Sequence, residues 1–116
     1  MQAARAFRAP GDADDRGPAR TIRAASFYAR ACEVGEMLGC ANLGVMHAEG
    51  DGVPRDLGRA AAPHGRACEG GIVRACANLG DMYRRGAGVP RDPAKAKALL
   101  ESACESGLAP ACDAAR

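Results

Sequence analysis

The chain has 116 residues, a formal net charge of +2 and a hydrophobic fraction of 47%. The small net charge and the dispersed arginines argue against a nucleic-acid partner, and no apolar run reaches the roughly 18 residues of a membrane span. Much of the apolar fraction is alanine and cysteine. Because each small side chain buries little area, at about 25 cal/mol per Å², we expect the core to need close backbone packing or covalent links.

Residues 1–19 are predicted to be a flexible N-terminal extension. This segment combines Pro10, Gly11 and Pro18 with three aspartates, and it lacks the apolar stretch of a signal peptide. The chain as given therefore either derives from a longer exported protein or works inside the cell, and the sequence leaves both open.

Residues 20–116 are predicted to form one helical domain. The first helix begins near residue 20, follows a spacing of about 3.6 residues and ends at Gly35. Further helices are expected at residues 38–49, 56–69, 74–85 and 92–106, with a last one beginning near Ala109. Segments 50–56 and 86–92 are rich in turn residues. They end in Asp56 and Asp92, which we expect to cap the helices that follow, and Pro93 stands at a first helical position, where proline is tolerated.

The middle of segment 56–69 departs from this regular pattern. Pro63 lies inside the expected helix, where proline costs about 3 kcal/mol. We therefore expect a kink or break between Ala60 and Pro63, with His64 as a surface residue beside it.

Six cysteines form three pairs that recur every 36 residues: Cys32 and Cys40, Cys68 and Cys76, Cys104 and Cys112. The neighbouring sequence repeats as well, with Cys-Ala-Asn-Leu-Gly at 40–44 and 76–80, and Gly-Val-Pro-Arg-Asp at 52–56 and 88–92. A period in the mid-thirties indicates stacked helix pairs. The predicted fold is an all-α (α/α) solenoid of antiparallel helix pairs, with about two full and two partial repeats.

The pattern Ala-x-Leu-Gly-x-x-His/Tyr-x-x-Gly-x-Gly-Val-x-x-Asp occurs at 41–56 and 77–92. It resembles the Sel-one-like repeat (SLR), a relative of the tetratricopeptide repeat, and the resemblance covers residues 20–116. The added cysteine pairs are similar to those of the cysteine-rich branch, which includes Hcp-type secreted proteins and a mitochondrial intermembrane-space assembly factor. The resemblance implies a non-catalytic scaffold that binds proteins or extended peptides. It also implies two alternatives: β-lactam binding or weak β-lactamase activity, and a role in respiratory-complex assembly.

The cysteine spacing favours disulfides once a turn separates the two thiols of each pair. Eight positions along one helix span about 12 Å, which is too far for a disulfide. Gly35, Gly71 and Gly107 lie inside the three pairs, so one helix can end there and the next return antiparallel. We therefore expect the bridges Cys32–Cys40, Cys68–Cys76 and Cys104–Cys112, with reduced structural thiols and a metal or haem site as the alternatives.

The redox state of these cysteines bears on the compartment. Disulfides would place the protein in the periplasm, the extracellular space or a mitochondrial intermembrane space, with a bacterial envelope or secreted protein as first choice. Reduced thiols would favour the cytoplasm.

No catalytic, cofactor or metal residue is predicted. Serine β-lactamases need Ser-x-x-Lys, and none of Ser26, Ser102 and Ser106 has a lysine three positions later. His47 occupies the position of Tyr83 in the next repeat, so we interpret it as a packing residue and not a base. Met46 and Met82 recur with the core pattern and are predicted to fill the core.

By analogy with tetratricopeptide arrays, the first helix of each pair lines a concave, partner-facing surface. The predicted partner-binding residues are Asn42, Val45, Glu49, Arg74, Asn78, Asp81, Arg84 and Arg85. Asn42 and Asn78 are the strongest candidates because an amide both donates and accepts hydrogen bonds; the alternative for each is a bond within its own repeat. Arg84 and Arg85 either clamp a carboxylate or form a solvated face. The oligomeric state stays open.

Overall fold

The computed structural model describes residues 18–115, and these residues form six helices and no strand, which confirms the predicted all-α class. The expected flexible extension lies outside the described residues except at positions 18 and 19, where the first helix has already begun. The helices are α1 (Pro18–Glu33), α2 (Met37–Glu49), α3 (Leu57–Glu69), α4 (Val73–Arg85), α5 (Pro93–Glu105) and α6 (Ala109–Ala114).

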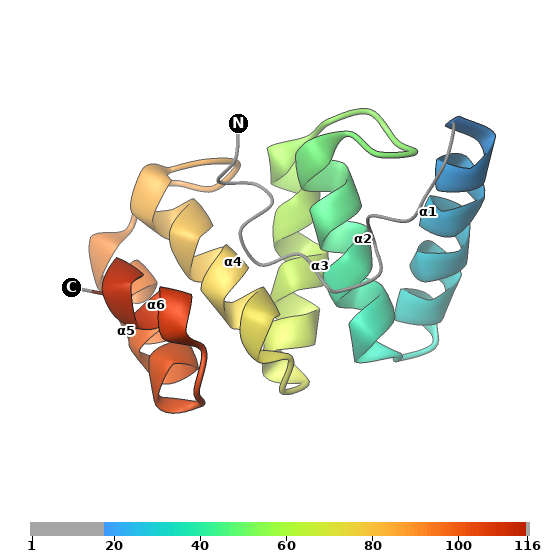
Figure 1. Ribbon diagram of the computed structural model, residues 1–116. Coiled ribbons are helices and arrows are strands. Elements are labelled where there is room, and N and C mark those ends of the chain that lie inside the picture. Colours follow the sequence, from blue (N-terminus) through green and yellow to red (C-terminus); the bar gives the residue numbers. More distant parts are fainter. Residues whose placement is uncertain (1–17, 116) are drawn as a thin grey trace.

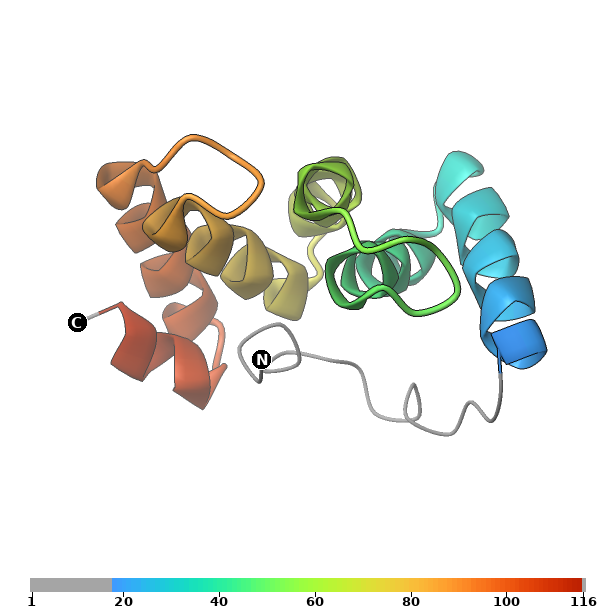
Figure 2. The same ribbon diagram turned by 90° about the horizontal axis from the view of Figure 1, so that it is seen from above.

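The helices pack side by side in chain order and form an elongated array (Figure 1). Successive helices run in opposite directions because a tight turn or a longer loop reverses the chain after each of the first five helices. Seen from above, α1 lies at one end of the array, and α5 and α6 lie at the other (Figure 2). The predicted solenoid of antiparallel helix pairs is therefore confirmed, and its two ends present different helices.

The two long loops repeat the same cap chemistry. Gly50 and Gly86 end α2 and α4 in the left-handed conformation, with φ of 78° and 68°, which favours glycine. The carboxylates of Asp56 and Asp92 each accept a hydrogen bond of 3.1 Å from a backbone N–H three residues later. Both N-caps predicted from the sequence are thus confirmed.

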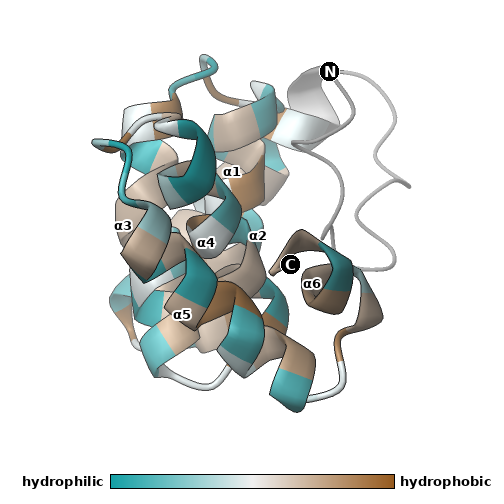
Figure 3. Cartoon of the chain, turned by 90° about the vertical axis from the view of Figure 1, so that its left-hand side faces the viewer, coloured by the Kyte–Doolittle hydropathy of each residue, from teal (hydrophilic) through white to brown (hydrophobic). Residues whose placement is uncertain are grey.

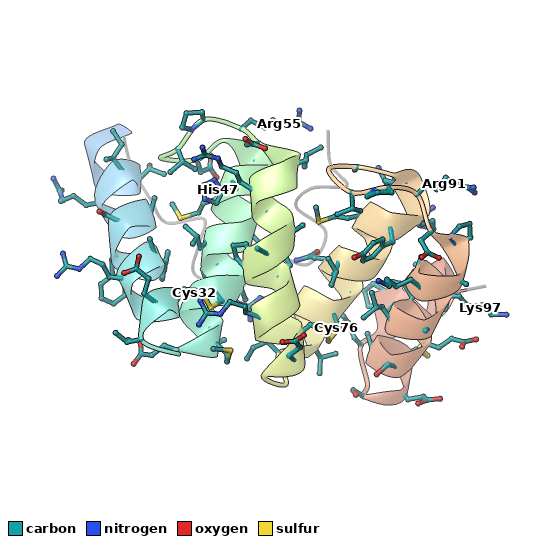
Figure 4. The ribbon with its side chains drawn as sticks, turned by 180° about the vertical axis from the view of Figure 1, so that it is seen from behind. Cys32, His47, Arg55, Cys76, Arg91 and Lys97 are labelled. Atoms are coloured by element: carbon teal, nitrogen blue, oxygen red, sulfur yellow. A yellow bond between two sulfur atoms is a disulfide. The ribbon has the colours of Figure 1, made fainter. Side chains whose placement is uncertain are left out.

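An arginine in each loop fastens the loop to the helix before it. Arg55 donates from Nε to the carbonyl oxygen of Ala48 at 3.1 Å, and Arg91 donates from Nε to that of Arg84 at 3.2 Å. Figure 4 shows the two arginines at equivalent loops along the same edge of the array. Because carbonyls at a helix C-terminus lack intrahelical donors, each arginine supplies a partner there and fixes the geometry between the paired helices.

The core is built from small side chains that let helices approach closely. Ala60, Ala67, Ala75 and Ala77 each have no measurable exposure. A Cβ added at Gly80 would lie 2.9 Å from Cγ of Leu100, so only glycine fits where α4 meets α5. The repeated Leu-Gly pair therefore has a direct packing reason.

The expectations for Pro63 and His64 are corrected by the structure. Helix α3 continues through Pro63 without a break. His64 is only 2% exposed, so it is a core residue and not a surface residue. The helix survives the proline because Ala60 and Ala67, on either side of it, are fully buried, and tertiary packing of one face outweighs the local cost.

Candidate functional site

Three disulfides join the helices at their turns, and the predicted pairing is confirmed. Cys32–Cys40, Cys68–Cys76 and Cys104–Cys112 have Cα–Cα distances of 4.5, 4.6 and 4.6 Å. No cysteine is left free. Each bridge spans a turn whose glycine has positive φ, between 92° and 100°. The bridges link α1 to α2, α3 to α4 and α5 to α6, and therefore fix the junctions that the long loops do not span.

Most of the predicted partner-binding residues on α4 lie along one helix face. Arg74, Asn78, Asp81 and Arg85 follow one another at intervals of four, three and four residues, which places them on neighbouring turns. We call this surface the α4 face. Among the described residues, it is the part of the predicted site that gathers most polar side chains on one helix.

The two adjacent arginines of α4 hold a carboxylate that belongs to the chain itself. Arg84 forms an ion pair with Asp81 Oδ1, and Arg85 Nε lies 3.0 Å from Asp81 Oδ2. The Arg84 and Arg85 side chains are nevertheless 46% and 47% exposed, whereas that of Asp81 is 19% exposed. Arg84 and Arg85 therefore hold a carboxylate of the chain itself, and both guanidinium groups also reach solvent, so the prediction that they bind a partner's carboxylate stays a prediction.

Asn42 connects two repeats through its side chain. Its Oδ1 accepts a hydrogen bond of 2.9 Å from Arg74 Nη2, which joins α2 to α4. Both residues were predicted to face a partner, and the alternative for Asn42 was a bond within its own repeat. The observed bond differs from both expectations, because its donor comes from the following repeat.

Asn78 is the repeat equivalent of Asn42, but its surroundings differ. The residue equivalent to Arg74 is Pro110, which offers no side-chain donor. Within residues 18–115, no hydrogen bond to the Asn78 amide is formed, although the residue is only partly exposed. The donors and the acceptor of this amide, one turn from Asp81, are therefore unpaired within the described part of the chain.

The other two predicted residues of α2, Val45 and Glu49, are less exposed than the prediction requires. Val45 is 2% exposed, so its side chain belongs to the core and the expectation that it contacts a partner is corrected. Glu49 lies in the last turn of α2 and is partly buried. Most of the predicted partner-binding residues that stay at the surface therefore lie on α4.

His47 and Tyr83 occupy equivalent positions and both contribute to packing. Burial, followed by the positive charge of Arg59, lowers the pKa of His47, and Asp56 partly opposes this. In the next repeat, Lys95 Nζ lies 4.9 Å from the centre of the Tyr83 ring, a cation–π contact. A neutral, partly buried imidazole in this place fits the interpretation of His47 as a packing residue.

Sequence reasoning missed a shallow groove between α3 and α5, with α4 at its base. It is lined by Ala61, Ala62, Gly65, Cys68, Glu69, Leu79, Tyr83, Lys95 and Leu99. A Cβ at Gly65 would meet no atom within 4 Å, so the groove is open there. The 36-residue alignment contains the signal, because Ala61 and Gly65 of α3 are much smaller than Lys97 and Glu101 at the equivalent positions of α5.

Neither a metal centre nor a membrane span is formed by the described residues. Between positions 18 and 115, no group of three or more His, Cys, Asp or Glu side chains is arranged to hold a metal ion. In the same region, no helix has both the length and the apolar character needed to cross a bilayer.

The fold and the disulfides together define a class of protein: an α/α repeat array in which disulfides join the helices across each short turn. The profile of the Sel1 repeat matches residues 38–71 and 73–108, which contain α2–α3 and α4–α5. The chain therefore belongs to the Sel1 repeat family, and the resemblance stated from its sequence motif is confirmed.

Three solved structures are similar to this chain. A Sel1 repeat protein from Oxalobacter formigenes is 38% identical with a TM-score of 0.76, over 79% of this chain and 27% of that one. The protective antigen c5321 of uropathogenic Escherichia coli, which has an SLR fold, is 33% identical with a TM-score of 0.73, over 76% and 19%. Helicobacter pylori cysteine rich protein B (HcpB) is 31% identical with a TM-score of 0.71, over 77% and 67%. No curated protein matches the chain.

The chain thus spans only about a quarter of the Oxalobacter protein and about a fifth of the Escherichia coli antigen.

Proposed function

We propose that this chain is a non-catalytic scaffold that binds an extended segment of a partner protein on the α4 face. Membership of the Sel1 repeat family supports this, because such repeats are typically protein-interaction modules. The observation that carries the proposal is Asn78, whose amide has no hydrogen bond within the described residues although its equivalent, Asn42, has one. An amide of this kind can donate to and accept from the backbone of a bound peptide.

The ion-pair cluster beside Asn78 would add charge recognition. Each guanidinium group has five N–H donors, and Asp81 occupies only part of them in Arg84 and Arg85. Because both arginine heads are about half exposed, a partner carboxylate can bind their outer N–H groups without displacing Asp81. The preferred partner segment is therefore extended and carries an acidic side chain about one helical turn from the backbone that Asn78 holds.

Three disulfides are typical of proteins that mature in an oxidising compartment. We place the proposed interaction in the periplasm or outside the cell, and the partner is to be sought there.

Affinity capture from envelope and secreted fractions tests the proposal, with the disulfide-bonded chain as bait. We would compare the wild type with Asn78→Ala and Arg85→Glu, and with two controls. Asn42→Ala removes the amide that Arg74 already occupies, and Arg59→Glu makes the same charge change on α3. Support is a protein retained by the wild type and Arg59→Glu but lost from both α4 variants. If all variants retain the same proteins, the α4 face is not the binding surface.

The family resemblance also implies two alternatives, β-lactam binding or hydrolysis and respiratory-complex assembly. No contact among residues 18–115 specifically favours either of them. A chromogenic cephalosporin assay addresses the β-lactam alternative, because hydrolysis in proportion to added protein would overturn the non-catalytic assignment. A visible absorbance band after incubation with haem or copper would favour a role in respiratory-complex assembly.

A further inference from the structure

One end of the array exposes an apolar surface. Within residues 18–115, the exposed large apolar side chains are Ile22, Phe27, Val34 and Leu38, between 55% and 78% exposed, and they lie on α1, directly after it, or at the start of α2. Phe27 and Val34 share the outer side of α1 with Arg23 and Arg30. We call Arg23, Phe27, Arg30 and Val34 the α1 face. This surface is apolar in its middle and positively charged at its edge.

The opposite end carries a groove of the opposite charge. It lies between α5 and α6 and is lined by Lys97, Glu101, Cys104, Glu105, Cys112 and Ala115. Two carboxylates against one ammonium group make this α5–α6 groove net negative. Figure 3 looks onto this end and shows hydrophilic and hydrophobic residues alternating along both helices. In Figure 4, Lys97 points outward from α5 at the edge of the array.

Repeat geometry indicates how the two ends would meet. Arg66 of α3 reaches back to the preceding junction, with Nη1 3.6 Å from Cys32 Sγ. Arg30 stands 36 residues before Arg66, and Cys104 stands two repeats after Cys32. If α1 of a second copy follows α6 as the next helix of the array, its Arg30 therefore lies at Cys104, in the groove that also holds Glu101 and Glu105.

The apolar contacts at the same place are complementary in size. A Cβ at Gly70, the C-cap residue of α3, would lie 2.3 Å from Cγ of Met37, so a large residue of α2 fills the space left by glycine. Val34 stands one repeat before Gly70, and Ala109 stands two repeats after Met37. At the junction between two copies, Val34 would therefore take the place of Gly70, and Ala109 the place of Met37. The large residue then comes from the α1 face and the small one from α6, so the space stays filled.

From these correspondences we infer that the chain associates with itself head to tail, the α1 face of one copy docking into the α5–α6 groove of the next. The contact uses different surfaces on the two copies, so it does not close on itself and adds copies in a line. Each added copy continues the solenoid, because its α1 takes the position of the next helix after α6. Because Arg30, Glu101 and Glu105 are exposed in the single chain, screening by salt weakens the contact.

Sedimentation velocity of the oxidised chain tests this inference. With rising protein concentration, the expected mass increases beyond that of a dimer, and high salt returns it toward the monomer. Arg30→Glu alone, and Glu101→Arg with Glu105→Arg, should each weaken self-association by about tenfold or more. Mixing the two variants should restore it, because every junction between unlike chains then joins opposite charges. Arg59→Glu makes the same charge change on α3, outside both surfaces. This control variant should associate like the wild type.

Two results would overturn the inference. One is a chain that stays monomeric up to millimolar concentration. The other is a dimer that stops growing and is indifferent to the Glu101→Arg and Glu105→Arg changes, which would mean that two α1 faces pair with each other. Circular dichroism and non-reducing mass measurements on each variant check that its helices and disulfides are intact, and Val34→Asp provides a second, uncoupled disruption of the α1 face.

Discussion

Acid should destabilise the fold through His64, the buried histidine of α3. The ring packs against α2, where a Cβ at Gly44 would lie 2.7 Å from Cε1 of His64. Burial, with a further contribution from Arg74, lowers the pKa of His64 from 6.5 to about 4. Nδ1 is buried without a hydrogen-bond partner among the described residues. The folded state therefore holds a neutral imidazole at pH 7, and protonation is resisted.

The size of the effect follows from the difference between the folded and unfolded pKa. Between the unfolded value of 6.5 and the folded value of about 4, the unfolded chain binds more protons than the folded chain, so stability falls as the pH falls. At 1.36 kcal/mol per pKa unit, the loss is about 3 kcal/mol, beginning near pH 6.5 and complete below pH 4. That is a large part of the 5–15 kcal/mol typical of a small domain.

Urea unfolding of the oxidised wild type and of His64→Leu, measured from pH 7.5 to 3.5, isolates this contribution. Leucine occupies the equivalent position in the next repeat, as Leu100, which is 1% exposed. The variant should be more stable than the wild type at pH 7, by about 1–3 kcal/mol, because an unsatisfied buried nitrogen is removed. The carboxylates titrate in both proteins, so their effect cancels in the difference. Parallel pH profiles for the two proteins would refute the reasoning.

Three further predictions concern stability. Replacing Cys68 and Cys76 by alanine should lower the free energy of unfolding by about 2–3 kcal/mol, and an unchanged urea midpoint would show that the bridge adds nothing to the helix contacts. Gly44→Ala should destabilise, since its Cβ meets the His64 ring, whereas Gly65→Ala, which meets open space, should stabilise by about 1 kcal/mol; thermal unfolding compares them, and equal shifts would contradict the packing argument. Asp92→Ala should cost about 1 kcal/mol through loss of the α5 cap, and an unchanged urea midpoint would contradict this.

The parts of the fold that depend on local contacts and on the repeat could be predicted from the sequence. The N-caps Asp56 and Asp92 need only a backbone N–H three residues away, and the disulfide pairs need only a turn. The pairing of Asp81 with Arg84 and Arg85 also follows helix spacing and could have been predicted. These features are decided within a few residues.

One error came from judging residues by local propensity alone. Pro63 predicted a broken helix and an exposed His64, yet the alignment with Leu100 indicates a core position for residue 64. Val45 was misplaced for another reason: the analogy with tetratricopeptide arrays put it on the partner-facing surface, although a valine there points to burial. The bond between Asn42 and Arg74 depends on the angle between successive repeats, which no single stretch of sequence specifies.

The disulfides have a consequence for how such an array can grow. Each bridge joins cysteines only eight positions apart. As a chain emerges N-terminus first, both thiols of a pair therefore become accessible before the first thiol of the next pair, and oxidation can proceed one junction at a time. Duplication of a 36-residue unit adds one complete pair and leaves no odd thiol. Lineages that carry this unit can lengthen or shorten it by whole repeats without creating a new problem of mispairing.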